Sequence, residues 1–522
     1  MKERTDDNMF IKKVVDEQTG EENTIVLHKD KPKPTTRREF LSSGLLGFSG
    51  TMVAPSILNV LARPEFAFGQ TDDSCSVPAA GLPAFIVVNL SGGASISGNL
   101  PPLGEDRQPL ARYDLLSLGP DNNVFTNDAI GSNWFQQQGD TGDFRMNVRV
   151  AGTRNAGVPR GHMFLGISLR ASQATIDKTA LVNACTASGD DTSNNQADPT
   201  GGVLAAGLTG ESLPNLGTRD GTGTGVGQQP AVVRPAAPLI VRNFTDISGA
   251  LGPAGTLATR LTASRRTKLL ELVNSLSGSQ ARAVASPGSA TGTMIAKVVE
   301  CATGKNIELA TQDMSTAIDP GLDPGVAAVW GINPNNKAGA AYAQAAMVFN
   351  ALKGNASTCS IDMGGYDYHG TGTANCNTRD QQAGEMIGRI LETAAVMSKP
   401  VFVYVVSDGS VSGPSGGAFG TGPTNDSGTR GELLFFAFHP SSRPRIKDDR
   451  WGRQIGHFTA GQGASDQTVV GTVQKGAAAA VANWLALAGG NNLSKFEAIY
   501  PGLFQRSEID GELVRIMPTS GS

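Results

Sequence analysis

The sequence predicts an α/β protein with a mostly parallel central sheet flanked by helices on both faces. Two observations lead to this fold class. Short apolar runs end abruptly in small or polar residues, and amphipathic stretches separate these runs. A continuous apolar run of about six residues is typical of a strand buried on both faces. Strands of this kind that alternate with helices favour a parallel sheet covered on both sides.

Three runs predict the central strands most clearly, and all three are continuous and apolar: Phe85–Leu90, Val401–Val406 and Leu433–Phe438. Ala180–Ala184 is a weaker candidate, and Thr358–Asp362 is a short one. The first run stops at Ser91-Gly92-Gly93, and the second stops at Ser407-Asp408-Gly409-Ser410. Open α/β sheets bind ligands beyond the carboxyl ends of their strands, so these polar endings mark the candidate functional edge.

Helical periodicity fills the intervals between the strands, in Leu269–Leu276, Ala340–Leu352, Gln381–Met397 and Val470–Leu487. Gly278, Gly354 and Gly489 follow three of these stretches, where glycine commonly ends a helix. Two regions carry neither pattern. The stretch Asn194–Pro238 is rich in Gly, Thr and Pro and predicts an insertion over one face of the sheet. The stretch Ser286–Gly339 is also expected to be irregular.

The N-terminal region predicts export. Thr36-Arg37-Arg38-Glu39-Phe40-Leu41 has the paired arginines and the Phe-Leu of a twin-arginine signal, and a weakly apolar stretch follows it. Ala67-Phe68-Gly69 has small residues at the two positions that a signal peptidase inspects. We therefore assign 1–35 to a disordered cytoplasmic leader and 36–69 to the signal. Residues 80–510 form one α/β domain with an insertion at about 194–238. If the signal is not cleaved, it acts as an N-terminal anchor.

This assignment implies that the twin-arginine translocase carries the folded protein to the periplasm. The apolar stretch is interrupted by Ser, Gly and Pro, so no permanent membrane span is expected after cleavage. Charged residues make up 17% of the chain and the formal net charge is -4. A chain without an excess of positive charge is a poor candidate for binding nucleic acid. The expected partners are therefore the translocase during export and a protein of the cell envelope afterwards.

The cysteine and histidine spacing excludes a zinc motif. Five cysteines allow at most two disulfides and leave one thiol, and they are Cys75, Cys185, Cys301, Cys359 and Cys376. A bridge between Cys359 and Cys376 is one open alternative, and it would close a modest loop. His439 and His457 flank a basic stretch with prolines, which is expected to be a solvated loop.

The segment Met363-Gly364-Gly365-Tyr366-Asp367-Tyr368-His369-Gly370 carries the strongest chemical pattern. Asp367 and His369 are two residues apart, so in an extended chain their side chains point the same way. A carboxylate and an imidazole at the end of a strand are natural ligands for a divalent metal. The alternative is a glycine-rich turn with a surface histidine and a capping aspartate. The spacing alone leaves both interpretations open.

The order of these motifs resembles that of the bacterial DUF1501 family, which is similar in fold to the alkaline phosphatase superfamily. The resemblance covers most of Phe85 to Phe504 and includes the twin-arginine signal. The family's Gly-Gly-aromatic-Asp-x-His motif is similar to Gly364–His369, and its usual close is similar to Phe496–Gly502. The family has a Ser-acidic-Phe-Gly-Arg segment after a strand. Ser407–Ser410 resembles this segment but lacks the Phe and the Arg. Its Asp-His-Gly motif corresponds to Asp426-Ser427-Gly428.

The departures from the family pattern bear on function. The resemblance places Ser95 at the first acidic position, Ser427 at a histidine position, and Ser193-Asn194-Asn195 at a Ser-His-Phe segment. Hydroxyl and amide groups cannot neutralise two divalent ions as carboxylates and imidazoles do. A two-metal site is therefore expected to be dismantled.

Four residues remain that the resemblance could bring together around one divalent metal ion: Asp367, His369, Asp408 and Asp426. Two functions follow. The first is a non-catalytic binding or scaffolding role in the cell envelope, on a degenerate site. The alternative is a metal-dependent hydrolase of phosphate or sulfate esters with Ser193 or Ser95 as nucleophile, although nothing in the sequence activates either serine.

Overall fold

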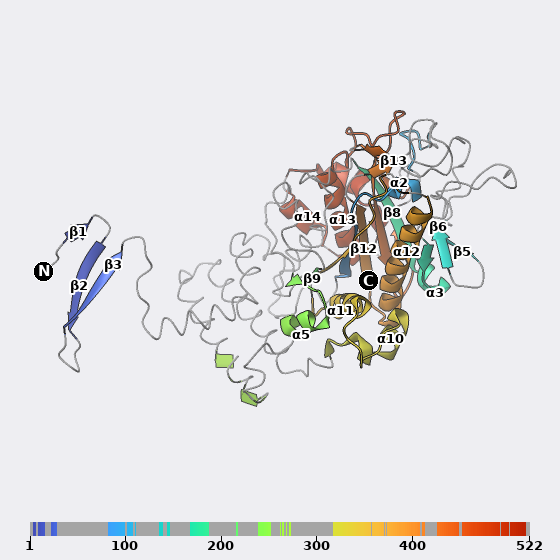
Figure 1. Cartoon of the computed structure of the whole chain (residues 1–522). Helices are drawn as coiled ribbons and strands as arrows, with labels where there is room; N and C mark the ends of the chain where they lie inside the picture. Colours follow the sequence, from blue (N-terminus) through green and yellow to red (C-terminus); the bar gives the residue numbers. More distant parts are fainter. Residues whose placement is uncertain are drawn as a thin grey trace, which may run out of the picture. The chain divides into compact units, whose positions relative to one another are not determined.

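The computed structural model (Figure 1) describes residues 4–6, 9–15, 22–28, 82–99, 102–107, 110, 135–138, 143–146, 168–186, 216–217, 239–251, 262, 264–265, 268, 271–272, 317–356, 358–369, 371, 373–407, 410–412, 425–427, 429–447, 452–490, 492–500 and 502–517. The chain divides into two compact units, Met1–Met52 and Val53–Ser522. Each unit is described by itself.

The first unit contains a three-stranded antiparallel sheet in the order β1-β2-β3. Its strands are β1 (Arg4–Asp6), β2 (Met9–Val15) and β3 (Glu22–His28). We expected a disordered leader from its mixed charges, and the three strands differ from that expectation. The reason is local: Phe10-Ile11 and Val14-Val15 on β2 and Ile25-Val26-Leu27 on β3 are residues that favour strands. The twin-arginine segment itself lies outside the described residues.

The second unit is built on a mixed, mostly parallel sheet in the order β10-β9-β11-β4-β12-β15-β8-β17. The long strands are β4 (Ala84–Leu90), β8 (Thr179–Thr186), β11 (Thr358–Met363), β12 (Val401–Ser407) and β15 (Gly431–Phe438). The short ones are β9 (Leu216–Gly217), β10 (Leu239–Ile240) and β17 (Gln454–Ile455). β15 runs antiparallel to both of its neighbours, and the other pairings are parallel. The predicted α/β class with a mostly parallel sheet is confirmed.

Alternate side chains of β4 enter two separate cores, so the sheet is covered on both faces. Ile86 and Val88 pack with residues of α11 (Ala340–Lys353) and α12 (Thr373–Val396). Phe85 and Val87 pack on the other face with residues of α13 (Val473–Ala488). The ring of Phe85 lies against Phe402, Tyr404 and Trp484. α10 (Pro324–Trp330) and α5 (Phe244–Leu251) extend the first core, and α14 (Ser494–Ile499) extends the second.

The remaining elements are short. They are α2 (Ile96–Asn99), α3 (Gln173–Ile176), α15 (Arg506–Glu508), the 3₁₀ turn η6 (Pro320–Leu322), the π-helical turn η7 (Ile509–Leu513), β5 (Phe135–Gln138), β6 (Asp143–Met146), β7 (Ser168–Arg170), β13 (Ser410–Ser412), β14 (Asn425–Ser427), β16 (Arg445–Ile446) and β18 (Ile516–Met517). α2 and β13 contact each other near one end of the sheet (Figure 1).

Most predicted elements of the sheet and its helices are present, with three differences. α10 lies inside the stretch that we expected to be irregular. The predicted insertion at about 194–238 lies mostly outside the described residues, but its Leu216–Gly217 forms β9 and pairs with β11. The helix expected at Leu269–Leu276 is also mostly outside them, although Glu271 and Leu272 are helical.

A disulfide between Cys359 and Cys376 is wrong, because both thiols are free and buried. Cys359 lies near the start of β11, whereas Cys376 lies in α12, with its thiol 3.7 Å from the carbonyl oxygen of Thr371 in the loop beyond that strand. Four residues of strand separate Cys359 from the end of β11, which is roughly 13 Å. Bridged cysteines need Cα atoms within about 7 Å.

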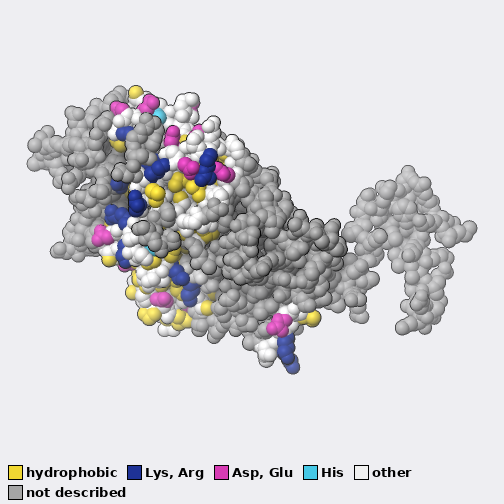
Figure 2. All heavy atoms as spheres, turned by 180° about the vertical axis from the view of Figure 1, so that it is seen from behind, with side chains coloured by type: hydrophobic (Ala, Val, Ile, Leu, Met, Phe, Trp, Pro, Cys, Tyr) yellow, Lys and Arg dark blue, Asp and Glu magenta, His cyan; other side chains and the backbone are white. Residues whose placement is uncertain are grey.

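The surface of the described residues carries mixed charge. In the face drawn in Figure 2, lysine and arginine side chains alternate with acidic and apolar ones. Within the parts of the chain that the structure describes, no helix combines the length and the apolar character needed to cross a membrane.

Candidate functional site

The carboxyl ends of β4, β11 and β12 meet at one edge of the sheet. Parallel register places Leu90 opposite both Met363 and Ser407, the last residues of the neighbouring strands. The two polar endings predicted from the sequence therefore start side by side with the segment that carries Asp367 and His369. This edge is the position where open α/β sheets bind their ligands.

The loops after β4 and β11 continue the pairing of their strands. The amide of Ser91 donates to the carbonyl of Met363 at 2.9 Å, and the amide of Tyr366 donates to the carbonyl of Ser91 at 3.1 Å. Gly92 has φ of 120°, and a Cβ built there would lie 2.6 Å from the backbone nitrogen of Asp367. Glycine is required at this position because the two backbones approach too closely for a side chain.

Replacing Gly92 with alanine is expected to lower the free energy of unfolding by about 1–3 kcal/mol, because the side chain is disfavoured at this φ and clashes with the second loop. Chemical denaturation measures the loss. Gly364→Ala is the matched control, because a Cβ at Gly364 meets nothing within 4 Å. Equal stability of the two variants would contradict the close approach of the loops.

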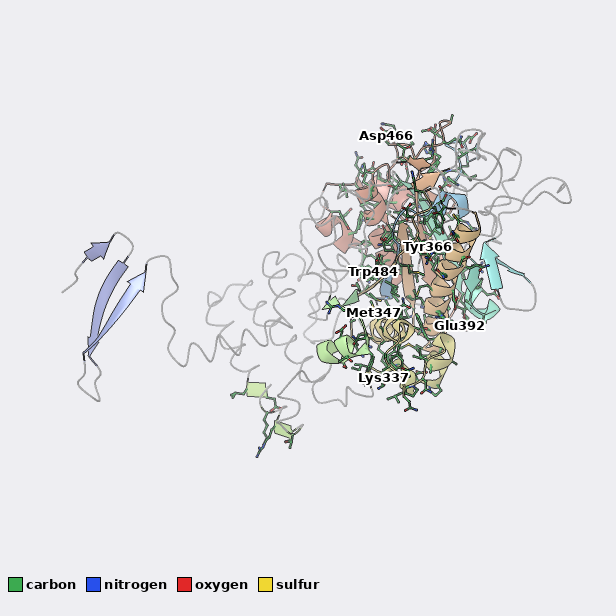
Figure 3. The ribbon with its side chains drawn as sticks, viewed as in Figure 1. Lys337, Met347, Tyr366, Glu392, Asp466 and Trp484 are labelled. Carbon is green, nitrogen blue, oxygen red and sulfur yellow. The ribbon has the colours of Figure 1, made fainter. Side chains whose placement is uncertain are left out.

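Two tyrosines anchor the loop after β11 to α12. Tyr366 and Tyr368 are fully buried, and their rings stack with centroids 6.1 Å apart. The hydroxyl of Tyr366, which is labelled in Figure 3, donates to the carbonyl of Arg379 at 2.8 Å. The hydroxyl of Tyr368 donates to the carboxylate of Asp380 at 2.6 Å. Burial, and then the charge of Asp380, raises the pKa of both hydroxyls far above the usual value, so both remain donors. These two hydrogen bonds therefore fix the loop after β11 to α12.

Asp367 and His369 alternate with the buried tyrosines and are exposed. One carboxylate oxygen of Asp367 accepts the amide of His369 at 3.0 Å, and the carbonyl of Asp367 accepts the hydroxyl of Thr371 at 2.9 Å. This is the capping arrangement that the sequence left open as the alternative to metal ligation. The two side chains share one side of a fixed loop, and one oxygen of the carboxylate is already engaged.

Ser95 follows the Gly92 turn and is buried, and so is Ser97 in α2. Ser407 at the end of β12 holds this turn. Its hydroxyl accepts the amide of Ala94 and donates to the carbonyl of Leu90, both at 2.7 Å. Ser95, which the resemblance to the DUF1501 family aligns with an acidic residue, is therefore a buried neutral side chain, whereas Asp367 and His369 are exposed.

Of the other predicted ligands, Asp426 comes from a segment near the same edge. β13 and β14 pair with Val411 opposite Asp426, and β13 contacts α2. The backbone of Asp426 is thus described, but its side chain is not. Asp408 and Ser193 lie outside the described residues. Within the described part of the chain, no group of three or more His, Cys, Asp and Glu side chains is arranged to hold a metal ion. Asp367 and His369 alone do not make up a metal site.

A second polar cluster lies at the same edge, between β8, β15 and β17, and the sequence reasoning missed it. It consists of Asn183, Cys185, Glu432 and Gln454, each at most 3% exposed. Its signal was visible as polar residues within apolar strand runs, since Asn183 interrupts one predicted strand and Glu432 precedes another. Burial raises the pKa of the Glu432 carboxyl well above its usual range, and the hydrogen bond from Asn183 opposes this.

Comparison with known proteins gave no match to a family model, to a curated protein or to a solved structure. The resemblance to the DUF1501 family therefore depends on the motifs alone.

Proposed function

We propose that this protein is an exported, DUF1501-like α/β protein with a degenerate alkaline-phosphatase-type site. Its function is non-catalytic binding or scaffolding in the cell envelope. The bound partner contacts the carboxyl edge of the sheet, where Asp367 and His369 are exposed.

The main support is the contrast between the two loops of this edge. The loop after β11 is held by its buried tyrosines and exposes a carboxylate and an imidazole on one side. The loop after β4 has the buried, neutral Ser95 where the family has an acidic residue. A carboxylate oxygen of Asp367 is already occupied by a backbone amide. A rigid loop with exposed polar groups suits recognition, because little conformational entropy is lost on binding.

A site-specific photo-crosslinker at position 369 of the full chain tests the proposal. We expect it to form a defined, saturable adduct with one envelope protein, and Asp367→Ala in the same chain should weaken that adduct by more than tenfold. Leu322, which is exposed in η6, is the matched control position and should give no such adduct. The fractionated protein should be periplasmic, and Arg37→Lys/Arg38→Lys should retain it in the cytoplasm.

The alternative is a metal-dependent hydrolase of phosphate or sulfate esters. The observation that favours it is the contact of β13 with α2, because β13 pairs with β14 and so brings the segment of Asp426 toward the edge that carries Asp367. A bound divalent ion would act as a Lewis acid on the ester, and Asp367 and His369 would supply a carboxylate and an imidazole to hold it.

Metal content of the mature protein, purified without chelator, separates the two functions. The binding role predicts no stoichiometric divalent ion and no difference between wild type and Asp367→Ala/His369→Ala. A stoichiometric ion that is lost in the double variant, together with ester hydrolysis that is lost in parallel, would contradict the binding role and support the hydrolase.

A further inference from the structure

A carboxyl group is buried in the sheet beside the candidate site. Glu432 is the second residue of β15 and lies opposite Cys185 of β8. The residue is 3% exposed. The amide nitrogen of Asn183 donates to Oε1 of Glu432 at 2.6 Å and to Oε1 of Gln454 at 3.3 Å. A carboxylate buried without a cation is costly, so its protonation state needs an explanation.

Two oxygen atoms in this cluster have no hydrogen-bond partner, namely Oε2 of Glu432 and Oδ1 of Asn183. Buried acceptors without partners are rare and costly. The orientation of the Asn183 amide is fixed, because reversing it would set its oxygen against two acceptor oxygens. A single proton on Glu432 gives both of these oxygen atoms a hydrogen-bond partner. It turns Oε2 into a donor, and a carboxylic acid and an amide that share one hydrogen bond can close a second between them. The raised pKa of Glu432 agrees with this state.

The hydrogen bonds continue from this pair to the backbone of Pro102–Arg107, which we call the strap. Oε1 of Gln454 accepts the amide of Leu103 at 2.8 Å, and its Nε2 donates to the carbonyl of Leu103 at 3.0 Å. Gln454 thus binds both backbone groups of one strap residue while also accepting from Asn183. Arg107 at the end of the strap donates to the carbonyl of Gly456 at 3.3 Å. The strap follows α2 in the chain, so it borders the candidate site.

We propose that Glu432 is a protonation switch that controls how firmly the strap is held on the sheet. The neutral acid donates to Asn183, which fixes Gln454 and through it Leu103. When Glu432 loses its proton to solvent, its carboxylate faces the oxygen of Asn183, the chain of hydrogen bonds loosens, and the strap opens more often.

Burial of Glu432 sets the direction of the switch, and the charged and titratable groups nearby come from several elements. They are Cys185 on β8, Arg430 immediately before β15, Arg107 and Glu105 on the strap, and His457 after β17. Burial, and then Glu432, raises the pKa of the Cys185 thiol, while Arg107 lowers it. Since the pKa of Glu432 is raised in the folded state, its stabilising contribution is complete below the usual pKa and is lost as pH rises toward the folded value.

Hydrogen exchange at the Leu103 amide of the full chain tests this proposal between about pH 5 and pH 9, with rates corrected for intrinsic exchange. The wild-type protection factor should fall by about tenfold or more as pH rises. Glu432→Gln, which stays neutral and can still donate to Asn183, should remove this dependence. Glu105→Gln removes an exposed carboxyl of the strap and should behave as wild type. A pH-independent wild type, or a Glu432→Gln variant that loses protection in parallel, would overturn the proposal.

If Glu432→Gln does not fold, infrared spectroscopy of the wild type labelled with ¹³C-glutamate gives the answer. The proposal requires the C=O band of one protonated glutamic acid at neutral pH, and this band should disappear over the pH range in which strap protection falls. Absence of that band at neutral pH would overturn the switch.

Discussion

Replacing Arg515 with alanine is expected to lower the free energy of unfolding by about 3–5 kcal/mol. The guanidinium is fully buried and donates to the carbonyls of Gly452, Gly511 and Lys447 at 2.8, 3.2 and 3.1 Å. These acceptors belong to three separate segments around the C-terminal part of the second core. Alanine would leave all three without this donor and would open a cavity.

Arg515→Lys should recover little of this loss, because a single ammonium cannot reproduce the fork of the guanidinium. Arg506→Ala is the matched control. Arg506 is about half exposed and pairs with Glu497 and Asp510, and exposed pairs of this kind contribute less than about 1 kcal/mol. Urea denaturation of the three variants measures the differences. If Arg515→Lys were as stable as the wild type, the positive charge alone would account for the stabilisation. That result would contradict the role of the three guanidinium hydrogen bonds.

Replacing Asp319 with alanine is expected to lower the free energy of unfolding by about 2–4 kcal/mol, because a buried hydroxyl and a helical N-cap lose their acceptor. The side chain of Asp319 is fully buried and accepts from Lys337, from the hydroxyl of Tyr342 and from the amide of Gly321. Removing the carboxylate leaves an ammonium and a buried hydroxyl without their acceptor. It also removes the N-cap of η6, the turn that precedes α10.

Asp323→Ala separates the buried charge from the capping effect. Asp323 caps α10 by accepting from Gly325 and Val326, and it has no cationic partner among the ion pairs of the described residues. Its loss should cost about 0.5–2 kcal/mol. Burial first, and Asp319 next, raises the pKa of Tyr342, so Asp319→Ala should also shift the alkaline ultraviolet titration of this tyrosine to lower pH. Equal stability losses in the two variants would contradict the buried-charge argument.

The strands could be predicted from sequence because each is buried on both faces and therefore reads as an unbroken apolar run. Val401–Val406 and Leu433–Phe438 are such runs, and both are strands. An apolar run carries no information on direction, which is why the antiparallel orientation of β15 could not be predicted. α10 was missed because it spans only two turns. Its signals were present, since Asp323 and Pro324 stand at its start and Gly331 at its end.

The candidate site was predictable only in part. Period-2 alternation correctly set Asp367 and His369 on one side of the loop, because Tyr366 and Tyr368 fill the other side. The hydrogen bond between the Asp367 carboxylate and the amide of His369 depends on the conformation of the local turn. The spacing of residues in the sequence does not determine that conformation. The contact of Asn183 with Glu432 joins residues 249 positions apart, and no local pattern in a single sequence reveals such a pair.

The position of β4 between β11 and β12 has a consequence for how the chain folds. Asn89 of β4 bonds Asp362 of β11 across 273 positions, so the centre of the sheet is formed from the two ends of a very long loop. Closing such a loop is slow, because its entropy is lost before any contact compensates for it. During synthesis, β4 leaves the ribosome long before either neighbour exists, with two open edges and an apolar sequence. This strand is where we expect chaperones to act on the nascent chain.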